Sequence, residues 1–230
     1  MAWGYARGAD GYGAEIYQNT EVLSIDVKNG KVCGVNTNKG YIETKQVLCA
    51  VAGFTPRITK MVDLETPIVI HPLQACVTEP MKPWLNSILV SGSLHVYVSQ
   101  SSRGELVMGS SLDPYEVHQT RSTLDFVEGL TSHMLDMFPF LSNVKIVRQW
   151  GGMADMTPDF APIMGKTPIE GFYIDAGWGT WGFKATPISG KTMAATIAND
   201  SDHELIHTFR LSRFEEYELT GEKGAASVGH

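Results

Sequence analysis

The chain has 230 residues, of which 43% are hydrophobic and 19% are charged, a composition that predicts a globular protein with one large domain or two interleaved ones. Its formal net charge of −7 excludes a general electrostatic attraction to nucleic acid or to an anionic membrane surface. No apolar run approaches the roughly 20 residues that a membrane-spanning helix needs. We therefore expect no nucleic acid and no membrane among the binding partners.

The three cysteines, Cys33, Cys49 and Cys76, are an odd number and include no CxxC pair. This spacing favours neither a disulfide framework nor a zinc site, and it predicts buried thiols in a reducing compartment. The first residues read MAWGYARGAD, without the basic region and apolar stretch of a signal peptide. A serine hydrolase is also excluded, because no GxSxG elbow is present. We therefore expect a cytoplasmic protein without a bound metal.

The amino-terminal part predicts a helix followed by a strand meander. Small and aromatic residues recur there at helical spacing, without a capping residue or a preceding strand: Ala2, Tyr5, Ala6, Ala9 and Gly13. Residues 15–18 read as a short strand. Asn-Gly and Lys-Gly pairs then separate three strands of a meander, at 21–27, 32–37 and 41–44. The apolar run 46–53 ends in small residues and predicts a buried parallel strand that leads into a ligand-facing loop.

Between about residues 67 and 147 the pattern predicts an antiparallel sheet covered by a helix. Four short runs read as strands, at 68–78, 88–91, 94–100 and 105–109. Alternation in the third run predicts that His95 and Tyr97 share one face of the sheet. Residues 124–138 read as an amphipathic helix whose apolar side packs on that sheet.

The last third predicts a return to alternating strand and helix. Residues 172–176 read as a short apolar strand, and a glycine-rich loop follows at 177–182. Residues 183–199 read as a helix, with Pro187 near the start, where the missing N–H does no harm. Residues 209–219 read as another short helix. No linker or internal repeat interrupts the chain, so we expect interleaved domains rather than domains strung along the sequence.

Three stretches of the last third resemble a known enzyme superfamily. Residues 148–153 read RQWGGM, residues 157–165 read TPDFAPIMG, and residues 177–184 read GWGTWGFK. The first two resemble the return from the substrate domain to the flavin domain in the D-amino-acid oxidase and sarcosine oxidase superfamily. The third is similar to the loop that passes beneath the flavin in that superfamily.

Shorter matches along the whole chain narrow the resemblance to the beta-subunit family of heterotetrameric sarcosine oxidases. The matching stretches are AWGYAR at 2–7, HPLQA at 71–75, HVYVSQ at 95–100, GELVMG at 104–109 and GAASVGH at 224–230. Trp181 departs from the family pattern, in which glycine is expected at that position. Its ring could change the pocket or block the flavin edge.

The resemblance implies a fold that mixes α/β and α+β architecture. Residues 1–66 and 149–230 would form an incomplete FAD-binding Rossmann-like domain, and residues 67–148 an inserted antiparallel-sheet substrate domain. In the family, the GxGxxG fingerprint for the FAD pyrophosphate and the histidine that carries FMN precede the AWG helix, and neither is found here. On this basis we expect a carboxyl-terminal fragment that is inactive alone and holds FAD weakly or not at all.

The activity implied by the resemblance is oxidation of a secondary amino acid such as sarcosine, by hydride transfer to FAD, to give glycine and a one-carbon unit. In the full complex, electrons would pass to FMN and then to oxygen, and other subunits of a hetero-oligomeric oxidase would be partners. Two alternatives stay open: a flavin-free assembly subunit that keeps the fold, and a related amine, proline or opine dehydrogenase subunit.

The glycine-rich loop has a physical basis for binding a flavin. Glycines allow the backbone to approach a flat ring closely, and the following helix start offers N–H groups and the positive end of its dipole. These groups suit the flavin edge that becomes negative on reduction, although a strand-to-helix turn without a ligand has the same local pattern. The cofactor-binding residues implied by the resemblance are Val22, Ala50 and Gly53 at the adenosine half and Gly177, Trp178, Gly179, Thr180, Gly182, Phe183 and Lys184 at the loop.

Three residues are candidates for contact with the substrate. Lys184 could hold a substrate carboxylate or contact the flavin or oxygen, since a lysine at a helix start is unfavourable with the dipole; the alternative is a solvated surface lysine. Tyr97 and His95 could line the amine pocket, or belong to an ordinary half-buried sheet face. Arg148, near Trp150 and Asp159, could form a buried ion pair or contact the substrate, and we favour the structural role.

Overall fold

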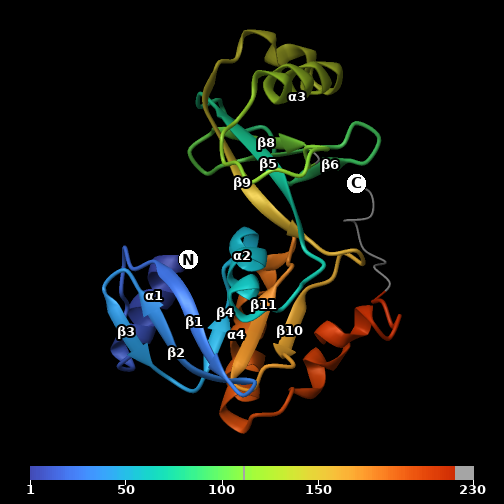
Figure 1. Cartoon of the computed structure of the whole chain (residues 1–230). Helices are drawn as coiled ribbons and strands as arrows, with labels where there is room; N and C mark the ends of the chain where they lie inside the picture. The colour runs from blue at the N-terminus through green and yellow to red at the C-terminus, as the bar shows by residue number, and fades with distance from the viewer. Residues whose placement is uncertain (111, 221–230) are drawn as a thin grey trace.

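The computed structural model describes residues 1–110 and 112–220, so the terminal match at 224–230 lies outside the described residues. The chain folds into two lobes joined by a narrow neck (Figure 1). The first and last parts of the chain lie together in one lobe, and the middle of the chain forms the other (Figure 1). No helix within the described ranges is long and apolar enough to cross a membrane.

The first lobe contains a three-stranded antiparallel sheet in the order β1-β2-β3. Its elements are α1 (Ala2–Gly11), β1 (Val22–Lys28), β2 (Lys31–Thr37) and β3 (Gly40–Glu43). The predicted helix and meander are confirmed, and the first turn has the positive φ at both Asn29 and Gly30 that a two-residue hairpin requires. The strand predicted at 15–18 is wrong, because these residues are exposed and form no strand.

A second sheet of the same lobe has the order β10-β11-β4. Its strands are β4 (Val47–Cys49), β10 (Ile163–Lys166) and β11 (Phe172–Ala176). β4 runs parallel to β11, as the apolar run predicts, and β10 pairs with β11 in the antiparallel sense. β11 is buried at Phe172, Tyr173 and Ile174, so this strand forms the centre of the lobe.

Helices connect and cover this second sheet. β4 is shorter than predicted because Ala52 takes a left-handed conformation and the chain turns into η1 (Ala52–Phe54), α2 (Thr55–Thr59) and η2 (Lys60–Val62). α4 (Gly182–Asn199) follows β11 and contributes Met193 to a buried cluster with Met164 and Tyr173. The predicted helix of the last third is therefore confirmed, with its start one residue earlier.

The second lobe is an antiparallel sheet of five strands in the order β6-β7-β8-β5-β9. Its strands are β5 (Val69–Thr78), β6 (Leu89–Ser91), β7 (Val96–Gln100), β8 (Leu106–Ser110) and β9 (Ile146–Met156). α3 (Leu124–Met137) covers the sheet, with Phe126, Leu130 and Met134 in its buried cluster, and η3 (Pro139–Asn143) leads into β9. The predicted sheet and covering helix are confirmed.

β9 connects the two lobes (Figure 1), yet its sequence carries no clear strand pattern. It pairs with β5 from Ile146, opposite Thr78, to Met156, opposite Val69. The adjacent glycines of its RQWGG stretch interrupt the apolar alternation by which a strand is recognised. Because β9 is so long, its last residues reach the first lobe.

The chain after α4 ends in two short 3-10 helices, η4 (Glu204–Phe209) and η5 (Leu211–Phe214), instead of the single helix predicted at 209–219. Arg213 of η5 is fully buried and pairs with Asp159 through Nε–Oδ2 and Nη2–Oδ1 distances of 2.8 and 2.9 Å. The expected ion pair between Arg148 and Asp159 is wrong, because β9 carries Arg148 into the second lobe, where it is exposed opposite Val77.

Thr123 caps α3 and supplies a test of the second lobe. Its Oγ1 accepts the N–H of Phe126 at 3.3 Å and an Nε2–H of buried Gln74 at 3.1 Å. We expect Thr123→Ala to lower the free energy of unfolding by about 1–2 kcal/mol, because both donors lose their acceptor, and Thr123→Ser to restore most of it. Urea unfolding checks this. The matched control is Thr131→Ala in the same helix, with an expected change of less than about 0.5 kcal/mol; equal losses would contradict the capping role.

Candidate functional site

The glycine-rich loop between β11 and α4 lies against the end of β9. Gly177 and Gly179 have φ values of +73° and +53°. A Cβ atom on Gly177 would lie 2.6 Å from Thr157 Cγ2, and one on Gly179 would lie 2.8 Å from Met156 Sδ. Both positions therefore require glycine, for the backbone conformation and for close contact with the chain at the end of β9.

Asp155, near the end of β9, holds the backbone of this loop. Its Oδ2 accepts the N–H of Gly177 at 2.6 Å, and its Oδ1 accepts the N–H of Gly179 at 3.1 Å. The residue is 4% exposed, and burial raises the pKa of its carboxyl, although the loop N–H groups oppose the rise. Sequence reasoning missed Asp155; the available signal was a lone acidic residue between the RQWGGM and TPDF stretches.

The loop is tied to α4 by a second carboxylate. Trp178 donates its Nε1–H to Asp175 of β11 at 2.6 Å, and the hydroxyl of Ser189 in α4 hydrogen-bonds the same carboxylate. A Cβ atom on Gly182 would meet Trp178 Cβ at 3.2 Å, so the indole packs on the helix start. Thr180, between them, is exposed. The loop is thus fixed on both sides while its tip is open.

The first turn of α4 has no side-chain cap. Trp181, at the N-cap position, accepts no capping hydrogen bond, and no acidic residue occurs in the first turn. Phe183 is 71% exposed, and Lys184 is exposed without a hydrogen bond or ion pair to the residues that the structure describes. The helix dipole and the Lys184 ammonium add, so this turn suits a negatively charged or electron-rich group.

Only some of the residues expected at the adenosine half of FAD lie near the glycine-rich loop. Gly53 is buried in η1, and a Cβ atom there would lie 2.8 Å from Met153 Cβ on β9. Ala50 is exposed just after β4. Val22 stands at the start of β1 and packs on the cluster that contains Cys49. The loop after β4 and the glycine-rich loop therefore both contact β9, whereas Val22 is linked to them through the core.

Tyr97 and His95 lie in the other lobe. β7 begins at Val96, and His95 precedes it with a φ of +52°. The predicted strand starts two residues too early, so the alternation that placed His95 and Tyr97 on one face does not extend to His95. Tyr97 is half-buried; burial raises its pKa, and a negative charge at Cys76 would raise it further.

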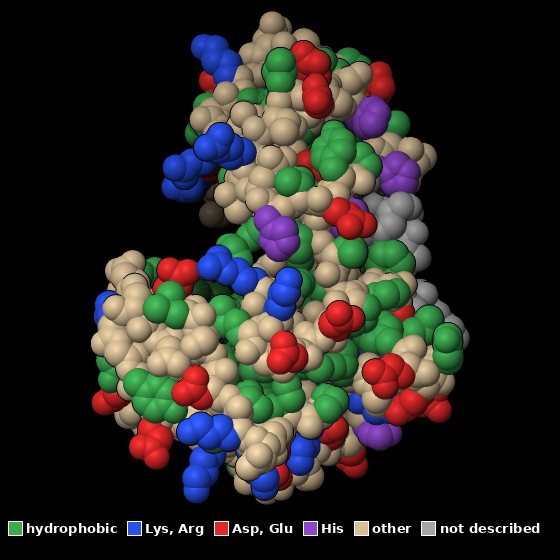
Figure 2. Space-filling model, viewed as in Figure 1, with side chains coloured by type: hydrophobic (Ala, Val, Ile, Leu, Met, Phe, Trp, Pro, Cys, Tyr) green, Lys and Arg blue, Asp and Glu red, His purple; other side chains and the backbone are tan. Residues whose placement is uncertain are grey.

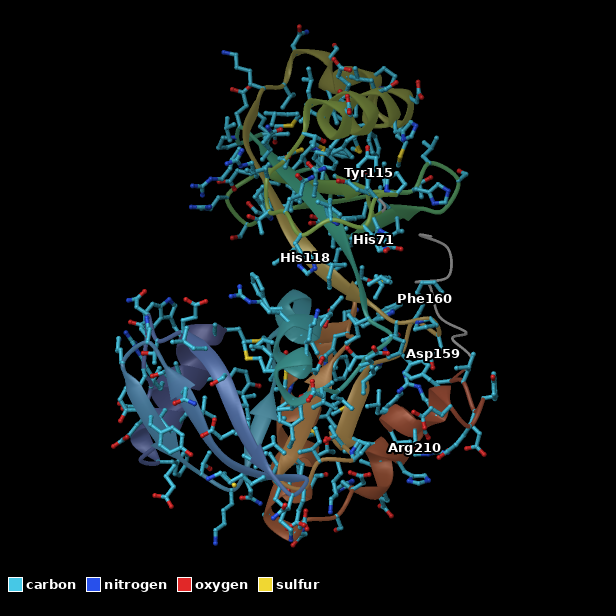
Figure 3. All side chains as sticks on the ribbon, in the orientation of Figure 1. His71, Tyr115, His118, Asp159, Phe160 and Arg210 are labelled. Atoms are coloured by element: carbon cyan, nitrogen blue, oxygen red, sulfur yellow. The ribbon has the colours of Figure 1, made fainter. Side chains whose placement is uncertain are left out.

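A cavity of about 580 Å³ lies where the second lobe meets the segment after β9. Its lining includes His71, His95, Met156 and Thr157; Figure 3 shows His71 at the neck. His71 Nδ1 is 3.0 Å from the carbonyl oxygen of Asp113, which only accepts, so Nδ1 carries the proton and neutral His71 keeps Nε2 as an acceptor. Because Met156 and Thr157 also contact the glycine-rich loop, the cavity and the loop share a wall.

The neck is also hollowed on the face seen in Figure 2, where Lys and Arg side chains of both lobes gather near a histidine. Figure 3 labels His118 at this position. A concave surface lined by cations concentrates anionic ligands. The net charge of the whole chain is −7, so these Lys and Arg side chains are a local feature of this face (Figure 2).

Residues 1–196 match the family described as FAD dependent oxidoreductase (DAO). The chain belongs to this family. Among curated relatives in the family, it is 42% identical over 230 residues to the sarcosine oxidase subunit beta of Arthrobacter, covering 100% of this chain and 57% of that protein. It is 43% identical to the corresponding subunit of Rhizobium meliloti, covering 97% and 54%. The chain thus spans about half the length of these relatives.

Solved structures of FAD-dependent oxidoreductases support the same fold. The L-proline dehydrogenase from P. horikoshii superposes with a TM-score of 0.88 at 28% identity, covering 95% of this chain and 60% of that one. The glycine oxidase from Bacillus cereus superposes with a TM-score of 0.80 at 24% identity, covering 92% and 57%. The expected fold class, a partial Rossmann-like domain with an antiparallel sheet, is confirmed.

The site residues fit the cofactor of the FAD-dependent oxidoreductase family. The glycines leave no side chain between the loop backbone and a ring, and the first turn of α4 offers uncapped N–H groups. Trp181 is 37% exposed, so its ring does not fill an internal cavity.

One His-Glu-x-x-His stretch, at 203–207, has the spacing of a zinc-binding α-helix. The cysteine spacing that disfavours a zinc site does not bear on this histidine motif. In the structure the stretch starts a 3-10 helix, and His203 is its N-cap, accepting the N–H of Leu205 through Nδ1. Across residues 1–110 and 112–220, no three potential metal ligands come together. The stretch is therefore not arranged as a zinc site.

Proposed function

We propose that this chain is part of a flavin-dependent oxidoreductase that oxidises a secondary amino acid such as sarcosine to glycine and a one-carbon unit. The observation that carries the proposal is the glycine-rich loop, held by Asp155 at its base and followed by an uncapped, positively polarised turn of α4. The similarity to two sarcosine oxidase beta subunits at 42% and 43% identity supports the choice of substrate.

In this proposal, the cofactor lies between the two loops that contact β9. Gly177–Lys184 would lie beneath the flavin, with Ala50, Gly53 and Val22 toward the adenosine half, and FAD supplies an acceptor for a hydride. The N–H groups of the first turn of α4 would stabilise negative charge on the flavin edge. The Lys184 ammonium would hold the substrate carboxylate, while Tyr97 and His95 would line the amine pocket.

The proposal divides the chain into an FAD-binding domain at 1–66 and 149–230 and a substrate domain at 67–148. The two lobes and the long connection through β9 support this division (Figure 1). In the complete enzyme we propose other subunits of a hetero-oligomeric oxidase as partners, and FMN as the second flavin. A cytoplasmic setting would keep the three free thiols reduced.

A related dehydrogenase of proline or an opine is the second candidate, because the L-proline dehydrogenase from P. horikoshii shares the fold at 28% identity. The test is a complete subunit that contains this chain, expressed with its partner subunits. We expect a bound-flavin absorption spectrum and bleaching of that spectrum by sarcosine in the absence of oxygen. Bleaching by proline or an opine alone would favour the second candidate, and a colourless protein that binds no added FAD would refute both.

A further inference from the structure

We infer that Asp155 is the positioning residue of the glycine-rich loop. By binding the N–H groups of this loop, it leaves the start of α4 to donate hydrogen bonds to a ligand. Both of its carboxylate oxygens are engaged by the loop: Oδ2 by Gly177 and Oδ1 by Gly179. The Gly179 N–H also lies 3.1 Å from the Asp155 carbonyl oxygen. This inference rests on the proposed function, in which the loop lies beneath a flavin.

The geometry makes the loop dependent on this carboxylate. Gly177 and Gly179 both have positive φ. Because glycine adopts many backbone conformations, the local chain alone does not fix this one, and the hydrogen bonds to Asp155 hold it. Asp155 is fixed in turn, because β9 pairs it with Ile70 of β5 and it is 4% exposed. A strand shared with the second lobe therefore sets the position of the flavin-facing loop.

The same contacts determine which N–H groups can face a ligand. The N–H groups of Gly177 and Gly179 are already bonded to Asp155, so they are not donors for a bound group. The Trp181 N–H is bonded to the Trp178 carbonyl oxygen. The first turn of α4 has no side-chain cap among the described residues, so its N–H groups are available as donors to a ligand. The loop thus provides a surface that a flat ring can approach closely, and the start of α4 provides the positive electrostatic potential.

No cation neutralises Asp155 among the residues that the structure describes, because its oxygens meet N–H dipoles of the loop instead. An asparagine at this position has one acceptor in place of two, and its NH₂ group would face an N–H of the loop. We therefore expect Asp155→Asn to release one of the two glycines and misplace the loop without removing the strand pairing of β9.

The test uses the complete FAD-loaded enzyme that contains this chain. We expect Asp155→Asn to raise the dissociation constant of FAD by about 10- to 100-fold, the range seen when the partner of a ligand-contacting group is lost, and to change the flavin midpoint potential. The control is Asp200→Asn at the other end of α4, where the carboxylate meets Tyr173 and Lys166. It removes the same charge and should change FAD affinity by less than about threefold.

Two measurements separate positioning from a loss of folding. Hydrogen exchange of the cofactor-free protein should be at least about tenfold faster at Gly177 and Gly179 in Asp155→Asn, with β11 still protected. Gly179→Ala, which displaces the same loop, should weaken FAD binding without adding to the effect of Asp155→Asn. Additive losses, or an Asp155→Asn enzyme that matches Asp200→Asn, would overturn the inference. A wild-type enzyme that binds no FAD would instead refute the proposed function.

Discussion

Replacing Arg213 with methionine is expected to lower the free energy of unfolding by about 3–5 kcal/mol, because it leaves the buried Asp159 carboxylate without its cation. Arg213 is fully buried, and it also donates to the carbonyl oxygens of Phe209, Arg210 and Ala161. The pair therefore fastens η5 to the segment after β9. Urea unfolding of the purified chain, followed by circular dichroism, measures the loss.

The control for this prediction lies in the same segment. Arg210 pairs with Glu216 and Glu218, whose side chains are well exposed, so Arg210→Met should cost no more than about 1 kcal/mol. Replacing both buried partners, Arg213→Met with Asp159→Leu, should recover much of the stability lost by the single change. A single Arg213→Met that is as mild as Arg210→Met would show that the ion pair contributes little.

Because of the ion pair between Arg213 and Asp159, we expect the free energy of unfolding to depend on pH. Burial acts to raise the pKa of Asp159, but hydrogen bonds from Arg213 and Thr220 outweigh it and hold that pKa below its usual value. A carboxyl with a lowered folded pKa stabilises the protein fully above its unfolded pKa of about 3.9, and this stability is lost as the pH falls through the folded value. Arg213→Met should therefore lose less stability than the wild type when the pH is lowered below about 4.

Lys184→Met is expected to lower kcat/KM for sarcosine by about 100- to 1,000-fold in the complete FAD-loaded enzyme, the effect of removing one charged donor from a reaction site. The reason is the position of Lys184 in the uncapped first turn of α4, where its ammonium adds to the helix dipole and has no partner among the described residues. Steady-state kinetics with the same FAD content in both enzymes provide the measurement.

The separate effects of the substitution on KM, on kcat and on flavin reoxidation decide which role Lys184 has. A rise in KM with little change in kcat would indicate contact with the substrate carboxylate, whereas normal anaerobic reduction with slow reoxidation would indicate a role with oxygen. Lys191→Met is the matched control, because it removes a second exposed lysine from the same helix and should leave kcat/KM within about twofold. If Lys184→Met behaves in the same way, Lys184 is an ordinary solvated lysine.

Local sequence patterns predicted the strands and helices whose apolar residues recur at a regular spacing or whose ends carry turn residues. The meander at β1 to β3, the buried strand β11 and the helices α3 and α4 were all indicated by turn residues, apolar runs and helical spacing. Two failures have a common cause. Residues 15–18 look like a strand but have no partner, and β9 is a strand whose glycines hide the alternation. Strand pairing is decided by distant residues, so the local pattern is ambiguous in both cases.

The glycine-rich loop was predicted from sequence, but the residues that hold it were not. Asp155 and Arg213 each belong to a buried polar network, and both act through contacts with residues far away in the chain. Arg148 is close to Asp159 in sequence, whereas η5 brings Arg213 to Asp159 across 54 positions. Proximity along the chain is a poor guide where a long strand carries residues into another lobe.

The family resemblance, the order of most strands and helices, and the loop whose glycines allow close approach to a flat ring can all be recognised from the amino-acid pattern. Three features became visible in the folded chain alone: the carboxylate that holds that loop, the arginine that neutralises Asp159, and the partial exposure of Trp181. The physical reason is that hydrogen bonds and ion pairs in the interior depend on three-dimensional packing, whereas backbone preferences and apolar periods are properties of neighbouring residues.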